Sequence, residues 1–171
     1  MASSKIDAGA PFPDLAWPTV QSGSFRPSAE TGWRLLVVYR GRHCPLCKTY
    51  LNTLNDLLAE CEQAGISVTA LSADGREQAE ADVAEFGWRF PVAYGLTFDE
   101  MRQLGLYISD PRSPAETDHQ FPEPAVFVIN PDNRVQVIDI SNAPCARPDL
   151  RALVGGVKFI MANNYPIRGA A

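Results

Sequence analysis

WRLLVVYRGRHCPLC, residues 33–47, joins a predicted strand to a predicted helix. Its first part, residues 33–39, is a short and nearly continuous apolar run of β-forming residues, which predicts a buried central strand. Pro45 then suits the first turn of a helix, where its missing N–H is not needed. We predict this helix over residues 45–64, with leucines at helical spacing along one face. A Cys-x-x-Cys pair therefore stands where a buried strand ends and a helix begins.

Downstream of this helix, the chain keeps alternating between strand and helix patterns. Asp74 with Glu77, and Thr97 with Glu100, have the spacing of helix capping boxes. Residues 109–122 are polar and contain proline, which predicts a long surface loop. The other predicted elements are a strand over residues 66–71, helices that begin near residues 74 and 97, a strand hairpin over residues 125–129 and 135–140, and a last helix from residue 148.

This order of elements predicts an α/β protein with a central mixed sheet. Two strands joined by a helix should be parallel with a right-handed crossover, whereas the later hairpin adds an antiparallel pair. Helices should then cover both faces of the sheet. Prolines in residues 11–18 favour edge strands or turns ahead of the first buried strand. We expect residues 1–10 to form a flexible arm and residues 11–171 to form a single domain.

The bulk properties of the chain exclude several classes of protein. Its 171 residues carry a formal net charge of −5, with 46% hydrophobic and 20% charged residues, which is an ordinary globular mix. A mildly acidic chain gives no argument for binding nucleic acid or an anionic membrane surface. No segment has the roughly 18 apolar residues of a membrane span, and the N-terminus does not resemble a secretion signal. We therefore expect a cytoplasmic protein with no nucleic-acid or membrane partner.

A cysteine pair at the start of a helix is suited to redox chemistry. The helix N-terminus carries a positive partial charge, and Arg40, Arg42 and His43 are close in sequence. Such surroundings lower a cysteine pKa from about 8.5 to roughly 3.5–7.5. We predict that Cys44, nearer the cap and more exposed, is the attacking thiol. Cys47, one turn inside the helix, is then the resolving thiol that closes the disulfide, and we expect no cofactor.

Other interpretations of the cysteines remain open from the residues alone. A Cys-x-x-Cys pair can be half of a zinc site, but zinc needs two further ligands. The remaining candidates, which form no second paired spacing, are Cys61, Cys145, His43 and His119. The domain could also sense redox state or bind partners without turnover. Cys61 lies on the apolar face of the first helix and is expected in the core, whereas Cys145 in a loop could be a remote partner thiol.

Three residues near the pair have two interpretations each. Tyr39, at the end of the strand, is either a core residue or part of the site. His43 is either a solvated neighbour of the cysteines or a proton shuttle. Pro124 precedes a strand that should begin near the cysteines, and cis is the minority form of such a bond, at about 5–6%. These positions are the predicted lining of the site, together with both arginines and Pro45.

Two segments carry a resemblance to a known family. VVYRGRHCPLCKTYLNTLNDLLAECEQAGISVTALSAD, residues 37–74, and FPEPAVFVINPDNRV, residues 121–135, resemble the peroxiredoxin-like branch of the AhpC/TSA group in the thioredoxin superfamily. The opening PFPDLAW, residues 11–17, is also similar to that group. The resemblance implies a thioredoxin-like fold with an N-terminal β extension and a cis bond before Pro124. It also implies reduction of peroxides or disulfides, a dithiol reductant such as a thioredoxin-type protein, and a homodimer.

The chain departs from the typical pattern of that group. Typical members carry Pro-x-x-x-Thr/Ser-x-x-Cys, and this frame laid on Cys47 puts Arg40 at its proline and Cys44 at its threonine. In that alignment Cys47 is the attacking thiol. Typical members also place a peroxide-binding arginine near the start of the later strand, where residues 123–125 offer none. The order in which the two thiols react is therefore not fixed by the sequence.

Overall fold

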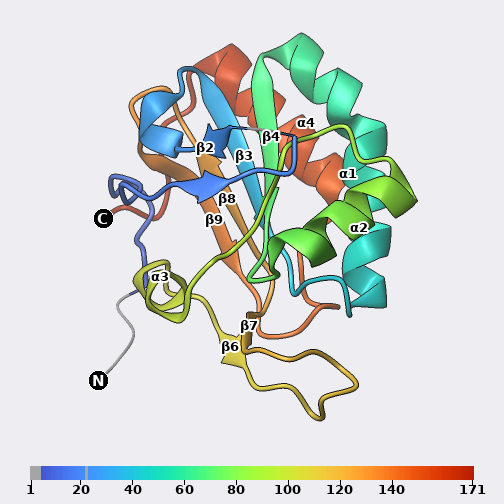
Figure 1. Cartoon of the computed structure of the whole chain (residues 1–171). Coiled ribbons are helices and arrows are strands. Elements are labelled where there is room, and N and C mark those ends of the chain that lie inside the picture. The colour runs from blue at the N-terminus through green and yellow to red at the C-terminus, as the bar shows by residue number, and fades with distance from the viewer. Residues whose placement is uncertain (1–4, 22) are drawn as a thin grey trace.

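The fold is taken from a computed structural model, which describes residues 5–21 and 23–171 (Figure 1). Residues 1–4 of the expected flexible arm lie outside the described residues. The elements in chain order are β1 (Trp17–Pro18), β2 (Ser24–Phe25), a 3-10 turn (Pro27–Ala29), β3 (Trp33–Val38), α1 (Pro45–Ala64), β4 (Ile66–Leu71), α2 (Arg76–Phe86), β5 (Val92–Ala93), α3 (Phe98–Gln103), β6 (Ile108–Ser109), β7 (Phe121–Pro122), β8 (Ala125–Ile129), β9 (Val135–Ile140) and α4 (Leu150–Asn163).

A mixed sheet of five strands, in the order β5-β4-β3-β8-β9, forms the centre of the protein. β3 is parallel to β4 and antiparallel to β8, while β5 is parallel to β4 and β9 is antiparallel to β8. β3 is therefore the middle strand, and all of its residues after Trp33 are buried. The prediction of an α/β fold built on a buried strand at this position is confirmed.

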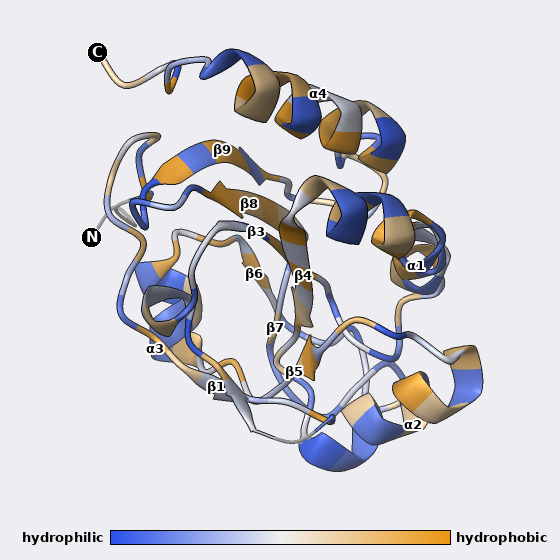
Figure 2. Cartoon of the chain, turned by 90° about the horizontal axis from the view of Figure 1, so that it is seen from above, coloured by the Kyte–Doolittle hydropathy of each residue, from blue (hydrophilic) through white to orange (hydrophobic). Residues whose placement is uncertain are grey.

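Two different layers cover the faces of this sheet (Figure 2). On one face, a core cluster joins β3 to α1, α2 and α4 through side chains that include Leu35, Val37, Leu54, Ala79 and Val154. On the other face, a second cluster joins β3 to the β1-β2 hairpin and α3 through side chains that include Trp17, Phe25, Leu36, Val38 and Met101. Successive residues of β3 thus serve opposite layers, as the alternation of a strand requires. The expected N-terminal β extension is the β1-β2 pair.

The predicted caps agree with the structure for α3 and differ for α2. Thr97 Oγ1 accepts the N–H of Glu100 at 3.3 Å, and the Glu100 carboxylate accepts the N–H of Thr97 at 2.9 Å. The box predicted from Asp74 is wrong, because Gly75 is the N-cap of α2 and its N–H donates to the Gln78 side chain at 3.1 Å. Asp74 is buried instead, beside the cysteine-bearing turn.

Two segments that were expected to be irregular form backbone hydrogen bonds. One is part of a small hairpin, and the other is attached to the central sheet. β6 and β7 pair antiparallel, with Ser109 opposite Phe121, so the predicted surface loop is the tip of a small hairpin. At the N-terminus, Gly9 N–H donates to Val135 O at 2.8 Å, and Val135 N–H donates to Ala10 O at 2.9 Å. This part of the expected flexible arm is therefore fastened to β9.

α4 closes the fold over the first core cluster. Asp149 is its N-cap, and the carboxylate accepts the N–H of Ala152 at 2.9 Å. Leu150, Val154 and Val157 are buried in the same cluster as α1. In the part of the chain that the structure describes, no helix is long and apolar enough to cross a membrane.

Core packing on α1 gives a direct test of this arrangement. Leu54 is fully buried, whereas Leu46 on the same helix is 52% exposed. We expect Leu54→Ala to lower the free energy of unfolding by about 2–5 kcal/mol, because it leaves a cavity in the core. Leu46→Ala, the matched control, should change it by no more than about 0.5 kcal/mol. Urea unfolding of both variants measures the difference, and equal losses would contradict the packing of α1.

Candidate active site

The two cysteines occupy the junction between β3 and α1. Cys44 is the N-cap of α1, and the N–H of Cys47 donates to Cys44 Sγ with an N–S distance of 3.3 Å. A thiol thus fills the capping role that a serine or aspartate oxygen usually fills. The two cysteine side chains are also hydrogen-bonded to each other. The predicted pair is therefore brought together by the first turn of the helix.

Both thiols are buried, so the greater exposure expected of Cys44 is almost absent. Cys44 is 1% exposed and Cys47 is 0% exposed. The reason is that the junction does not project from the surface, since Cys44 belongs to the same core cluster as Val37 and Leu51. The reacting sulfurs therefore lie beneath the surface of the protein.

The environment separates the pKa values of the two thiols. The pKa of Cys44 is lowered to about 6, chiefly by the hydrogen bond from the Cys47 thiol; the Cys47 N–H and the Arg40 guanidinium act in the same direction, against burial. Burial raises the pKa of Cys47, and the neighbouring Cys44 raises it further. At neutral pH the pair consequently holds one thiolate, at Cys44, and one thiol, at Cys47.

Arg40 is the predicted cation that does reach the pair. It lies on the Cys44 side, and its Nε is 3.1 Å from a carboxylate oxygen of Glu123. Its guanidinium stacks over Phe121, 4.8 Å from the ring centroid, and also approaches Glu116 at 4.0 Å. The segment around β7 therefore fixes the cation that stabilises the Cys44 thiolate.

The other two predicted cations do not act on the cysteines. Arg42 turns toward α2, where Nη1 lies 2.6 Å from Asp82 and 2.8 Å from Glu85. The pKa of His43 is lowered to about 4 by burial and by the charge of Arg40, so its ring is neutral at pH 7. The ring packs against Phe121, with 4.5 Å between centroids, and its nitrogens make no hydrogen bond to the described residues.

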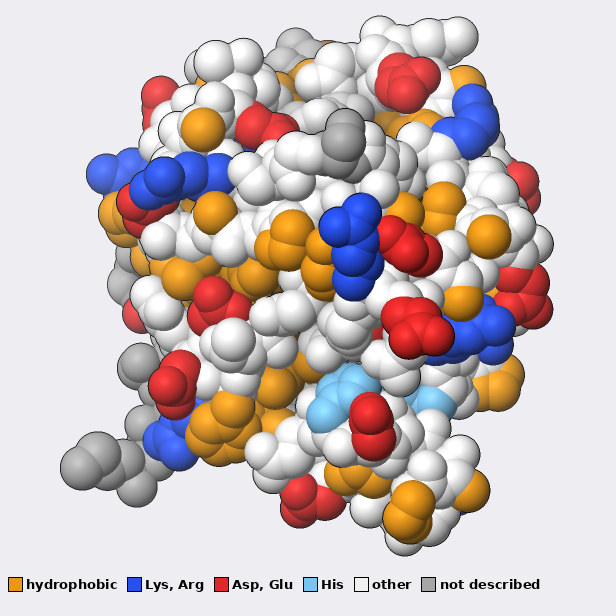
Figure 3. All heavy atoms as spheres, in the orientation of Figure 1, with side chains coloured by type: hydrophobic (Ala, Val, Ile, Leu, Met, Phe, Trp, Pro, Cys, Tyr) orange, Lys and Arg blue, Asp and Glu red, His pale blue; other side chains and the backbone are white. Residues whose placement is uncertain are grey.

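Asp74 is a buried group that sequence reasoning placed in the wrong role. Its carboxylate accepts the N–H of Arg42 at 2.7 Å, and it lies 3.3 Å from His119 Nε2. Gly41 has φ of +130°, and a Cβ there would stand 2.6 Å from an Asp74 oxygen. The glycine of the Tyr-Arg-Gly run is therefore required by this close approach. Figure 3 shows both histidine side chains close together on this side of the molecule.

Arg147 is a site residue that the sequence did not reveal. It lies between β9 and α4, and its Nη2 donates to Cys47 Sγ at 3.2 Å. Nε donates to Pro144 O at 2.7 Å, and the guanidinium sits 4.5 Å from the centroid of the Tyr50 ring. A hundred residues separate the two partners, and no motif surrounds the arginine, so only the folded chain shows the contact.

The remaining predicted lining residues serve the framework. Tyr39 is a core residue whose ring meets Trp88 edge to face at 6.2 Å. Pro45 is the first residue of α1, as predicted. The bond before Pro124 is not cis, since residues 5–21 and 23–171 contain no cis peptide bond. Pro124 directly precedes β8, and its carbonyl oxygen accepts the N–H of Ser141 at 2.9 Å, next to the β8-β9 ladder.

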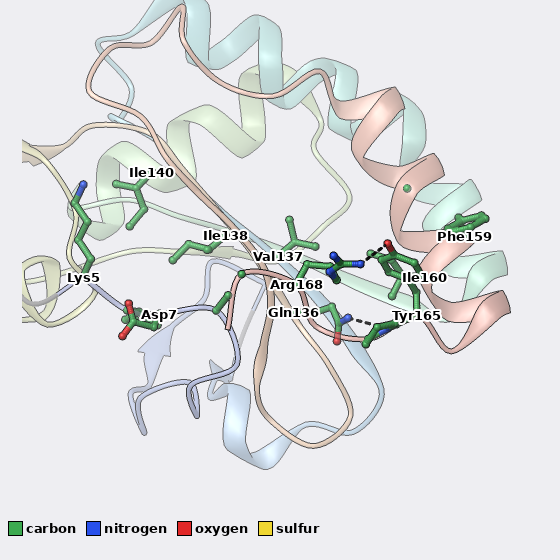
Figure 4. Close-up of a pocket in the computed structure, with 15 residues that line it drawn as sticks. Lys5, Asp7, Gln136, Val137, Ile138, Ile140, Phe159, Ile160, Tyr165 and Arg168 are labelled. Atoms are coloured by element: carbon green, nitrogen blue, oxygen red, sulfur yellow. Dashed lines mark hydrogen bonds between the residues drawn. The ribbon is translucent and has the colours of Figure 1, made fainter. Parts of the chain in front are cut away.

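The other features of the chain lie apart from the cysteine pair. Cys61 is buried in the core, as expected, and Cys145 is exposed. Among the described residues, no group of three or more His, Cys, Asp or Glu side chains could hold a metal ion. A cavity of about 840 Å³ opens between β9, α4 and the segments at both ends of the chain (Figure 4). None of the cysteines lines it, so it is separate from the redox site.

A mixed sheet with a Cys-x-x-Cys pair on the first turn after its central strand defines a thioredoxin-like thiol oxidoreductase. Residues 8–138 match the AhpC/TSA family, and the chain belongs to that family. The protein is accordingly a thiol-dependent oxidoreductase of the peroxiredoxin-like kind. The family resemblance expected from residues 37–74 and 121–135 is confirmed. No curated protein matches the chain significantly.

Solved structures share this fold at low sequence identity. A mutant of peroxiredoxin 6 from Arenicola marina has a TM-score of 0.77 and 18% identity, over 94% of this chain and 76% of that one. A peroxiredoxin-like protein from Aquifex aeolicus has a TM-score of 0.77 and 19% identity, over 93% and 90%. A PrxQ mutant from Xylella fastidiosa has a TM-score of 0.73 and 17% identity, over 95% and 99%.

The low pKa of Cys44 can be measured by alkylation. Iodoacetamide reacts with the thiolate, so in a Cys145→Ser background the alkylation rate of Cys44 should rise with pH and level off above a midpoint of about 6. Arg40→Met should move that midpoint upward by about 1–3 units, because a cation beside the thiolate is lost. Arg151→Met, which removes an exposed arginine, is the control. A midpoint unmoved by Arg40→Met would contradict the role of this cation.

Asp74 should leave a signature in the pH dependence of stability. Burial raises its pKa to about 6, from 3.8. Between about pH 4 and pH 6, the folded chain keeps a proton that the unfolded chain has released, so this contribution to stability is lost as pH rises through about 6. Asp74→Asn removes the ionisation. Its free energy of unfolding should therefore decline less than that of wild type over this range in urea titrations.

The control for this measurement is Asp56→Asn, which changes an exposed aspartate on α1. Its pH dependence should follow wild type. If Asp74→Asn also follows wild type, the buried carboxyl does not carry the raised pKa.

Proposed function

We propose that this protein reduces hydroperoxides, with Cys44 as the attacking thiolate and Cys47 as the resolving thiol. The proposal rests on the direction of the hydrogen bonds between the two cysteines. Cys44 Sγ accepts hydrogen bonds from both the thiol and the N–H of Cys47. These bonds stabilise negative charge on Cys44 and leave Cys47 protonated. The geometry thus favours Cys44 over the alternative family alignment, in which Cys47 attacks first.

Burial of the pair favours a small oxidant over a protein disulfide. Cys44 is 1% exposed, so a folded protein cannot bring a disulfide into line with its sulfur without moving the surrounding chain. A hydroperoxide is small enough to enter a narrow opening. The peroxiredoxins among the structural relatives are consistent with this choice of substrate class.

The proposed reaction has two chemical steps. In the first, the Cys44 thiolate attacks the terminal O–H oxygen of the hydroperoxide, an S–O bond forms, the O–O bond breaks, and the departing alkoxide or hydroxide takes a proton from solvent to leave as the alcohol or water. Cys44 is then a sulfenic acid. In the second, the Cys47 sulfur attacks Cys44 Sγ, the S–O bond breaks, and water leaves with the Cys47 proton. The Cys44–Cys47 disulfide holds the two oxidising equivalents.

Return to the dithiol needs an external reductant. A dithiol, such as a thioredoxin-type protein, supplies two electrons by thiol–disulfide exchange. A hollow of about 380 Å³ beside the first turns of α1 is lined by Leu46, Tyr50 and Arg147. Because Arg147 also touches Cys47 Sγ, one side chain separates this hollow from the resolving sulfur. We propose it as the approach for the reductant, whose thiol reaches the buried disulfide when Arg147 moves aside. The homodimer and the cytoplasmic location stay predictions.

Single-turnover reaction with hydrogen peroxide tests the assignment. Wild type should consume one equivalent and form the Cys44–Cys47 disulfide. Cys44→Ser should consume none above background. Cys47→Ser, whose hydroxyl keeps a donor toward Cys44, should consume one equivalent and accumulate a sulfenic acid that dimedone traps on Cys44. Mass spectrometry of the trapped peptide identifies the oxidised residue.

The control is Cys145→Ser, which removes the exposed thiol and should leave both steps unchanged. If Cys44→Ser reacts at the wild-type rate while Cys47→Ser is inert, Cys47 is the attacking thiol and the proposed order is reversed. If wild type does not react, the peroxide is excluded as substrate.

A further inference from the structure

Arg147 is held against Cys47 by three independent contacts. Its Nε donates to Pro144 O, its guanidinium stacks over Tyr50, and its Nη2 donates to Cys47 Sγ at 3.2 Å. Tyr50 is itself fixed, because its hydroxyl donates to Pro148 O at 2.6 Å. The arginine therefore bridges α1 and the segment before α4 in one defined position, with its charge on a single sulfur.

The raised pKa of Cys47 is unfavourable for the second step of the proposed reaction. Cys47 must lose its proton to attack, yet burial and the neighbouring Cys44 both raise its pKa. The charge of Arg147 is the main influence that acts in the opposite direction. Once Cys44 has become a neutral sulfenic acid, it no longer holds a negative charge beside Cys47, and the opposing charge of Arg147 remains.

We propose that Arg147 is the catalytic residue of the resolving step, an inference that rests on the proposed function. It stabilises the Cys47 thiolate while that sulfur attacks Cys44 Sγ and the S–O bond breaks. Its Nη1 is buried and makes no hydrogen bond to the described residues. The oxygen bound to Cys44 departs with the proton of Cys47, as water.

Two arginines thereby divide the reaction between them. The Arg40 guanidinium acts on Cys44 in the peroxide step, and the Arg147 guanidinium acts on Cys47 in the resolving step. The backbone of Arg40 also hydrogen-bonds Cys47, but a change of the Arg40 side chain leaves that bond in place. The two cations come from different segments: one from the turn after β3, the other from the segment between β9 and α4. A change in one should therefore slow one step and spare the other.

Separate measurement of the two steps tests this division. Reduced protein in a Cys145→Ser background is mixed with one equivalent of hydrogen peroxide. Peroxide loss reports the first step, and decay of the dimedone-reactive sulfenic acid reports the second. Arg147→Met should change the first rate less than about twofold and slow the second at least about tenfold, because an opposite charge in contact shifts a pKa by about 1–3 units.

A pH series distinguishes this electrostatic role from a structural one. Raising the pH should partly restore the resolving rate of Arg147→Met, since more Cys47 is then ionised, whereas a misplaced thiol would not recover. Arg147→Lys, which keeps the charge, should retain more of the rate than Arg147→Met. Arg151→Met on exposed α4 should match wild type in both steps. Thermal unfolding of each variant checks that the segment before α4 stays folded.

Two results would overturn the inference. If Arg147→Met slows peroxide loss and spares sulfenic acid decay, the arginine serves the attacking thiol. If both rates equal wild type, the contact has no part in the chemistry. Failure of the proposed function is a different result, because it is read from Cys44→Ser, in which Arg147 is unchanged.

Discussion

Cys44 is at once the N-cap of α1 and the thiol with the lower pKa, and these are consequences of one interaction. The N–H of Cys47 would be an unsatisfied donor at the start of a buried helix, and Cys44 Sγ satisfies it. The same donor stabilises negative charge on that sulfur. An acceptor at Cys44 therefore favours the start of the helix here, and a thiolate is a better acceptor than a thiol. Folding of the first turn and activation of the nucleophile are favoured by the same geometry.

Basic residues that lie near the cysteines in the sequence do not all lie near the thiols in the folded structure. Arg40, Arg42 and His43 precede the pair within a few residues, yet of these only Arg40 acts directly on Cys44. Arg42 is neutralised by two carboxylates on α2, and His43 is kept neutral by burial beside Arg40. The site thus limits its positive charge to the cations that touch sulfur. A surplus would stabilise both thiolates and remove the difference between the two thiols on which an ordered reaction depends.

The periodicity of the chain predicted the fold because its main elements are fixed locally or by burial. The apolar run of β3, the leucine face of α1 and the Thr97 cap each depend on residues that lie close together in sequence. The cysteine pair was predicted for the same reason. The roles of Asp74 and Arg147 were not, because they depend on partners 32 and 100 residues away. The cis bond before Pro124 was implied only by the family resemblance, whereas the residues alone favoured the trans form that the structure has. Burial of Cys44 was also missed, since no local pattern shows which chain segments close over a helix start.

Burial is the constraint that gives the two cysteines unequal roles. Burial raises the pKa of both thiols, and different groups of the protein oppose this effect at Cys44 and at Cys47. For Cys44 the offset is mostly local, from the first turn of α1, so it is present as soon as that turn forms. For Cys47 the largest offset comes from the charge of Arg147 in the segment before α4, so most of it requires the C-terminal helix to be docked. A chain that had folded its sheet and α1 but not α4 would hold a reactive Cys44 without an activated partner. Complete folding is therefore what couples the oxidised thiol to its resolution, and Arg147 is the residue through which the last helix takes part in the chemistry.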